Sequence, residues 1–175
     1  LDTQAAIGRV QLRRLPEFIE ARKRNWETLR RGLAANEDVL EFALPTHATS
    51  WDADSGFSWD ASGCRADCSW FGFKIAVRPH APFSRTELAC QLDAKGIGNR
   101  MLFGGNLIRQ PAFVELRNDR PNAFRQVAEL SNADMIMNST LFLGTFPGLT
   151  KNMIAREVEV IREFALERAS ATFAG

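Results

Sequence analysis

Residues 70–103 read WFGFKIAVRPHAPFSRTELACQLDAKGIGNRMLF, and this stretch decides the fold class. Its first part, Trp70–Val77, is aromatic and β-branched, which predicts a strand, and apolar residues on both faces predict a central position in a sheet. Ser84 and Glu87 form a capping box, which predicts the start of a helix. Ile97–Phe103 is the predicted returning strand, so the stretch forms an αβ unit.

Upstream of this unit, residues 3–35 have the apolar spacing of one long helix. Pro16 lacks a backbone donor and is expected to kink or break that helix. The apolar face is made by six residues: Leu12, Leu15, Ile19, Trp26, Leu29 and Leu33. The other side carries Arg22, Lys23 and Arg24, which form either a solvated helix face or an anion-binding patch.

Shorter elements are expected on both sides of the central unit. Val39–Leu44 predicts a short strand, and the aperiodic residues 46–69 predict a long loop. Downstream, the pattern predicts a sharp turn, a polar linker, two short helices, a last strand or extended segment, and a capped final helix. The turn is expected at Gly104–Asn106 and the linker at Arg117–Asn122. The first short helix is expected at Ala123–Leu130, with Phe124 and Val127 inward, and the second from Ser131. The last strand or extended segment is expected at Leu141–Thr145, and the final helix follows Thr150, with Val158, Ile161 and Ala165 inward.

These elements together predict the α+β class. We expect a small antiparallel or mixed sheet with helices packed on it. A long opening helix over residues 1–36 leads into a small α+β domain over residues 37–175.

The composition is that of an ordinary globular protein. The 175 residues are 45% hydrophobic and 25% charged, and a net charge of +1 gives no reason to expect nucleic acid or an anionic membrane as a partner. No apolar run approaches the roughly 20 residues that span a bilayer, and no signal peptide opens the sequence. Three cysteines favour a reducing compartment, so the cytoplasm is the expected location. The start at Leu1, inside a helical pattern, suggests a fragment or a processed chain.

Few residues suggest catalysis within this chain. His47 and His80 have no carboxylate or nucleophile at a telling spacing and are expected to be surface histidines. Cys64 and Cys68 would be half of a metal site and no second pair follows, so no metal is predicted. Cys90 falls in the capped helix and is expected in the core.

The segment Gly98–Pro111 offers the best ligand site in the sequence. Arg presents a rigid fork to phosphate or carboxylate oxygens, Asn and Gln bond sugar hydroxyls, and glycine lets the backbone approach a ligand. These groups come from six residues: Arg100, Gly104, Gly105, Asn106, Arg109 and Gln110. An anionic, hydroxylated ligand would use them, but a tight turn with surface ion pairs explains the same residues equally well.

Seven segments, taken in order, resemble one family. Two of them look like the helix that opens the small domain of the DegT/DnrJ/EryC1/StrS sugar aminotransferase family, and five are similar to its dehydratase branch. That branch includes the RfbH-type CDP-4-keto-6-deoxyglucose 3-dehydrases and the ColD-type GDP-4-keto-6-deoxymannose 3-dehydratases. The segments are Thr3–Gly8, Leu15–Arg24, Ser69–Phe73, Ala81–Leu88, Arg100–Asn106, Arg109–Phe113 and Pro147–Thr150.

The resemblance implies a homodimeric, fold-type-I enzyme related to aspartate aminotransferase, of which this chain is the C-terminal small domain. It implies pyridoxal or pyridoxamine 5'-phosphate as cofactor, and C3 deoxygenation of a CDP- or GDP-4-keto-6-deoxyhexose in deoxysugar or lipopolysaccharide O-antigen biosynthesis. In this branch a histidine base replaces the usual lysine, and it lies in the large domain, which this chain lacks. No catalytic residue is therefore expected here, and the chain alone is predicted to be inactive. An iron–sulfur cluster, present in some members, would be held by large-domain cysteines, and a reductase would be a further partner.

The resemblance assigns substrate binding to eight positions: Trp70, Phe71, Arg100, Phe103, Gly104, Gly105, Asn106 and Arg109. Trp70 and Phe71 would stack on sugar or cofactor, or belong to an aromatic core. Gln4 would lie near a dimer interface. The sequence departs from the family pattern in its long 46–69 loop, at Asn99 in place of Thr, and over residues 114–122, which lack a tyrosine-containing stretch. A sister sugar aminotransferase and a non-catalytic α+β binding module remain as alternatives.

Overall fold

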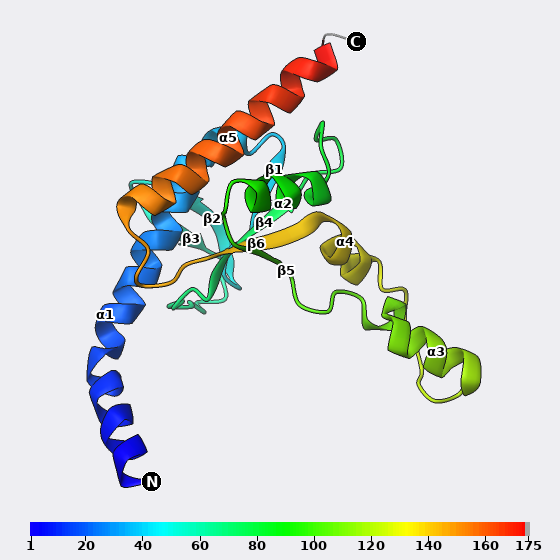
Figure 1. The fold of residues 1–175 in the computed structure, drawn as a ribbon, viewed down its shortest axis with the longest axis horizontal. Coiled ribbons are helices and arrows are strands. Elements are labelled where there is room, and N and C mark those ends of the chain that lie inside the picture. Colours follow the sequence, from blue (N-terminus) through cyan, green and yellow to red (C-terminus); the bar gives the residue numbers. More distant parts are fainter. Residues whose placement is uncertain (174–175) are drawn as a thin grey trace.

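The computed structural model describes residues 1–173 of the chain, which form helices and two small sheets (Figure 1). The strands are β1 (Leu40–Phe42), β2 (Ala48–Asp52), β3 (Gly56–Trp59), β4 (Gly72–Val77), β5 (Asn99–Met101) and β6 (Thr140–Gly144). The helices are α1 (Asp2–Gly32), α2 (Arg85–Ala94), α3 (Pro111–Asp119), α4 (Ser131–Ser139) and α5 (Lys151–Phe173), with 3-10 turns η1 (Ala34–Asn36) and η2 (Leu107–Arg109). The predicted α+β class is confirmed.

The main sheet has the strand order β1-β4-β6-β5, and every neighbouring pair is antiparallel. The predicted strand–helix–strand unit is present as β4, α2 and β5. Its two strands do not pair with each other, because β6 lies between them. The unit is therefore a split βαβ motif, closed by a strand from much later in the chain.

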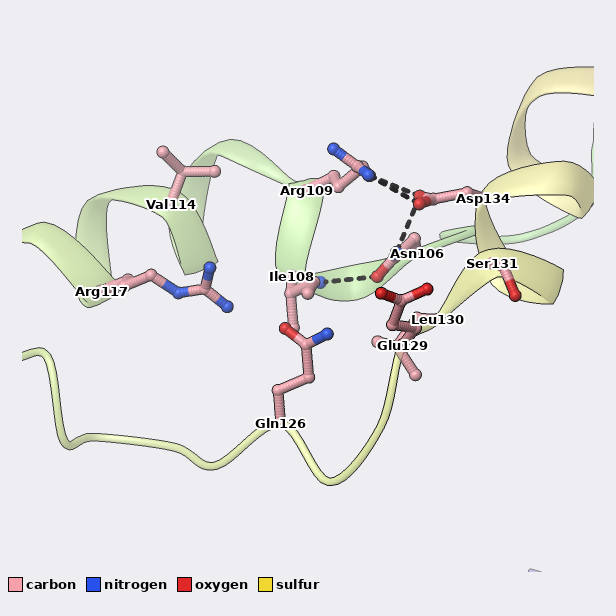
Figure 2. Close-up of a pocket in the computed structure, with 10 residues that line it drawn as sticks. All are labelled: Asn106, Ile108, Arg109, Val114, Arg117, Gln126, Glu129, Leu130, Ser131 and Asp134. Carbon is pink, nitrogen blue, oxygen red and sulfur yellow. Dashed lines mark hydrogen bonds and ion pairs between the residues drawn. The ribbon is translucent and has the colours of Figure 1, made fainter.

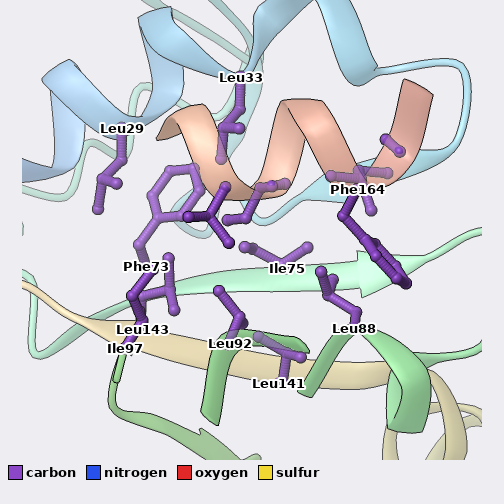
Figure 3. Packing of buried hydrophobic residues seen from close by; sticks show 14 of the residues in the cluster. Leu29, Leu33, Phe73, Ile75, Leu88, Leu92, Ile97, Leu141, Leu143 and Phe164 are labelled. Carbon is purple, nitrogen blue, oxygen red and sulfur yellow. The ribbon is translucent and has the colours of Figure 1, made fainter. Parts of the chain in front are cut away.

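One face of this sheet is covered by helices, and the core lies there. Along β4, Phe73, Ile75 and Val77 are buried, as are Leu141 and Leu143 of β6, which pair with Ile75 and Phe73. Figure 3 shows four of them, Phe73, Ile75, Leu141 and Leu143, beneath α1 and α5, with α2 alongside. The alternate residues of each strand point to the opposite face, which is only partly covered.

Helix α1 runs through Pro16 without a break, so the predicted break is absent, and the ribbon curves along its length (Figure 1). The apolar face of α1 is buried in only one half of the helix. Trp26 and Leu29 are in the core, whereas Leu12 and Leu15 are exposed on the half that extends away from the domain. The capping box before α2 is confirmed, since the backbone N–H of Glu87 donates to Ser84.

The predicted long loop over residues 46–69 is wrong in part, because it contains the β2–β3 hairpin. The Asp52 side chain accepts hydrogen bonds from the backbone of Asp54 (2.9 Å) and Ser55 (3.0 Å), and Gly56 takes a positive φ of 77°, which together make the turn. Trp51 then packs edge-on against Trp26 at a ring distance of 5.7 Å. These contacts, distant in sequence, fold a segment that has no periodicity.

The linker predicted at Arg117–Asn122 is wrong in part, because α3 extends to Asp119, and the helix predicted at Ala123–Leu130 is wrong. Helix α3 begins earlier, at Pro111, because proline is favoured in the first turn of a helix, where its missing donor is not needed. Residues 123–130 form no helix; Phe124 is half-buried against Phe113, but Val127 is exposed. Helix α4 does start at Ser131, although no side chain caps it.

The end of the chain follows its local signals. β6 occupies most of the segment predicted as strand or extended, and Thr150 caps α5 by accepting from the backbone N–H of Met153 at 3.2 Å. Ile161 and Ala165 are buried in the core, and Val158 packs against it.

Candidate functional site

The turn after β5 is held by glycine. Gly105 has a positive φ of 58°, and a Cβ atom there would lie 2.5 Å from the side chain of Met137 in α4. Only glycine fits both conditions. This close approach brings η2 against α4 and places Asn106 and Arg109 opposite Asp134 (Figure 2).

Asp134 is the centre of a polar cluster. Asn106, which is 1% exposed, donates from Nδ2 to Asp134 Oδ1 at 2.8 Å, and its own Oδ1 accepts from the backbone of Ile108 at 3.3 Å. Arg109 donates from Nη2 to Asp134 Oδ2 at 2.6 Å and also from Nε to Oδ1. This two-pronged contact is the geometry that arginine forms with carboxylates.

The electrostatics of the cluster make Asp134 a permanent anion near neutral pH. Hydrogen bonds from Arg109 and then Asn106 hold the pKa of Asp134 below its usual range. The same bond to Asp134 raises the pKa of Arg109. A carboxylate with a lowered pKa is a weak base, so the contacts of Asp134 favour a structural role in which it joins η2 to α4.

A pocket of about 640 Å³ opens beside this cluster. Its other walls are largely polar and come from η2, α3, the start of α4 and the segment between the two helices: Ile108, Val114, Arg117, Gln126, Glu129, Leu130 and Ser131 (Figure 2). Such a lining suits a hydroxylated ligand.

The structure divides the eight predicted ligand residues into three groups. Asn106 and Arg109 come together on Asp134, a partner that sequence reasoning missed because Ser131–Asp134 was interpreted only as the start of a helix. Gly104 and Gly105 line a smaller pocket of about 230 Å³ that Phe103 shares. Their role in ligand binding stays a prediction.

The remaining predicted residues lie elsewhere on the sheet. The indole of Trp70 stacks on Trp26 at 4.5 Å and packs against the core. Phe71 and Arg100 are exposed, and Phe71 lies beside Phe142 of β6, another residue that sequence reasoning missed.

The basic cluster of α1 makes internal contacts. Arg22 donates to the carbonyl oxygen of Trp70 at 3.0 Å, just before β4. Lys23 pairs with Glu20 at 3.2 Å and with Asp67 at 2.7 Å. These two side chains therefore tie α1 to the segment that enters the sheet.

Both histidines are exposed, as predicted. His47 lies 3.0 Å from Asp60, and His80 lies 2.7 Å from the carbonyl oxygen of Asp38. The prediction for Cys90 is wrong: it is exposed, because the buried side of α2 is formed by its neighbours Leu88, Ala89 and Leu92. Within residues 1–173, no three His, Cys, Asp or Glu side chains gather as a metal site would require. Among the helices described, none has the length and apolar character of a membrane span.

Comparison with known proteins identifies the family. Residues 1–162 match the model of the DegT/DnrJ/EryC1/StrS aminotransferase family. The chain belongs to this family. Among solved structures, it resembles E. coli GDP-4-keto-6-deoxy-D-mannose-3-dehydratase with bound hydrated PLP, with a TM-score of 0.66 and 24% identity over 89% of this chain. It also resembles S. venezuelae DesV in complex with a ketimine intermediate, with a TM-score of 0.65 and 20% identity over 93% of this chain and 36% of DesV.

Two further relatives are more similar in sequence than these structures. The lipopolysaccharide biosynthesis protein RfbH of Salmonella typhimurium is 39% identical over 163 residues, which is 93% of this chain and 32% of RfbH. The dTDP-4-dehydro-2,6-dideoxy-D-glucose 3-dehydratase of Saccharopolyspora spinosa is 36% identical over 163 residues, which is 93% of this chain and 30% of that dehydratase. The chain thus spans about a third of the relatives it matches.

Proposed function

We propose that this chain is the small domain of a nucleotide-sugar 3-dehydratase, which removes the C3 hydroxyl of a CDP- or GDP-4-keto-6-deoxyhexose in deoxysugar or lipopolysaccharide O-antigen biosynthesis. The observation that carries the proposal is the similarity to RfbH and to a 3-dehydratase over 93% of the chain. The enzyme would be cytoplasmic and homodimeric, with a reductase as a further partner.

The cofactor of such an enzyme would be pyridoxamine phosphate, which supplies an electron sink when bound. The Asp134 cluster is not a site for it. The pyridine nitrogen of such a cofactor pairs with a carboxylate, and the Asp134 carboxylate is already paired with the Arg109 guanidinium and bonded by Asn106. We therefore assign the cofactor, and any iron–sulfur cluster, to the part of the enzyme outside this chain.

The chain's own residues would bind and orient the substrate. The Asp134 cluster joins η2 to α4, and Gln110 donates from Nε2 to the carbonyl oxygen of Gly104 at 2.7 Å, so two contacts brace the turn between β5 and α3. Neither His47 nor His80 lines the pocket beside it. This arrangement supports a binding surface whose catalytic base comes from elsewhere.

The test compares two reactions of the full-length enzyme that contains this chain. In the first reaction, the enzyme receives pyridoxamine phosphate and either CDP-4-keto-6-deoxyglucose or GDP-4-keto-6-deoxymannose. We expect the sugar to lose its C3 hydroxyl, which mass spectrometry detects. Amino transfer from glutamate without loss of that hydroxyl would instead establish the sister aminotransferase activity. The 175-residue chain alone is the control and should turn over neither substrate.

A further inference from the structure

The partly covered face of the main sheet carries one aromatic side chain between two cations. In the strand register, Phe142 of β6 pairs with Lys74 of β4 on one side and with Arg100 of β5 on the other. Directly paired residues of antiparallel strands project to the same face. Lys74 and Arg100 therefore flank Phe142, on the side of the sheet away from the core.

Two further rings extend this row. Phe71 lies 5.8 Å and Phe103 lies 6.2 Å from the ring of Phe142, and they are 69% and 79% exposed. We call Phe71, Phe103 and Phe142 the aromatic platform. Large rings are seldom left this open in a group, because removing apolar surface from water is favourable.

The platform is held in place by the backbone beneath it. Gly72 has no side chain, and a Cβ atom there would lie 2.6 Å from Cδ2 of Phe142. The ring of Phe142 therefore occupies the space over Gly72. Phe103 has a positive φ of 51°, an unfavourable conformation for a non-glycine residue, and it presents its ring at the end of this row.

The charge around the platform is positive. Within residues 1–173, no ion pair engages Lys74 or Arg100. The nearest carboxylate in the strand register belongs to Glu41, which pairs with Ala76 in the sheet and lies 3.7 Å from Arg78. The backbones at Lys74 and Arg100 are two strand spacings apart, about 10 Å, so both side chains can reach one diphosphate group between them.

We propose that the aromatic platform binds the nucleoside diphosphate end of a nucleotide-sugar, with the base on Phe71 or Phe103 and the diphosphate between Lys74 and Arg100. A planar base stacks on aromatic rings, and lysine and arginine bind phosphate oxygens. The substrate class rests on the proposed function. This chain would then hold the nucleotide, and the sugar would extend toward the rest of the enzyme.

The test is a titration of the 175-residue chain with CDP. Calorimetry measures the affinity, and NMR signals of the phenylalanine rings report where CDP binds. Cytidine and inorganic pyrophosphate are titrated separately as the two fragments of CDP. We expect saturable binding of CDP, with shifts confined to the platform, and at least tenfold weaker binding of either fragment. Lys74→Gln and Arg100→Gln should each weaken CDP binding about tenfold, equivalent to about 1.4 kcal/mol. Phe142→Leu should weaken CDP more than pyrophosphate.

The matched control is Lys95→Gln, which removes the same charge from an exposed position at the end of α2 and should leave CDP affinity unchanged. Thermal melts verify that each variant is folded. The proposal is overturned if CDP does not bind, if its shifts lie outside the platform, or if Lys95→Gln weakens binding as much as Lys74→Gln. Dehydration by the full-length enzyme without CDP binding here would refute the platform alone, and binding without dehydration would refute only the proposed function.

Discussion

Replacing Gly72 by alanine tests how tightly the central strands are packed. The added Cβ would lie 2.6 Å from Phe142 Cδ2 and 2.8 Å from the carbonyl oxygen of Leu143. The ring can turn away, but the carbonyl oxygen belongs to the neighbouring strand, which is paired along its length with β4. Gly72→Ala must therefore shift β6 or lose part of this pairing.

The cost follows from that geometry. Overpacking by one methyl group typically costs 1–3 kcal/mol, so we take about 2 kcal/mol. For a domain of this size, each kcal/mol lowers Tm by about 2–4 °C, which gives an expected drop of about 4–8 °C in a calorimetric melt. The same shift should displace Phe142 and weaken CDP binding.

Gly98→Ala is the control, because no atom lies within 4 Å of a Cβ at that position. Its Tm should stay within about 1–2 °C of wild type. If Gly72→Ala melts no lower than Gly98→Ala, the contact between β4 and β6 is looser than described, and the fixed position of Phe142 is refuted.

Three further changes probe other contacts. Ser84→Ala removes the cap of α2 and should cost about 1 kcal/mol, or about 2–4 °C in Tm, whereas the exposed neighbour Thr86→Ala should cost less; equal melts would contradict the cap. Burial raises the pKa of Glu157 to about 7 from an ordinary 4.5, so the folded state binds the extra proton between these values and loses stability as pH rises through them. Compared with Glu157→Gln, the wild type should lose on the order of 1–2 kcal/mol of its free energy of unfolding between about pH 5 and pH 8, after allowance for screening by solvent. The same change of Tm with pH in both proteins would refute this. Asp134→Asn removes the charge that Arg109 binds and should speed amide hydrogen exchange in the turn after β5; unchanged exchange there would show that the cluster does not hold the turn.

Local signals were sufficient for part of the fold. The capping box at Ser84 and the cap at Thr150 each depend on residues three positions apart, and both are present. The aromatic, β-branched segment before Val77 became β4, because its pattern suits a strand with one fully buried face.

Contacts between distant segments were not predictable in this way. The β2–β3 hairpin depends on Trp51 meeting Trp26 and Arg30 of α1, and no periodicity within residues 46–69 signals it. The insertion of β6 between β4 and β5 also has no local signature.

The candidate site followed the same rule. The residue types of the Arg100–Arg109 motif suggest a ligand, and the structure places two of them, Asn106 and Arg109, on Asp134; ligand binding there stays a prediction. Asp134 and Phe142 could be connected to it only by the register of the sheet and the approach of α4 to Gly105.

The position of β6 also governs when this domain can fold. β4 and β5 are made early in the chain, but the strand that joins them arrives late, and Gly72 pairs with Gly144 roughly 70 residues further on. During synthesis, the edges of β4 and β5 that later pair with β6 keep unpaired backbone N–H and C=O groups. Such edges are the parts of a sheet most prone to pair with other chains. Folding should therefore be slow and should depend on residues 140–144, so that a chain stopped just before them would be far more prone to aggregate than one stopped inside α5.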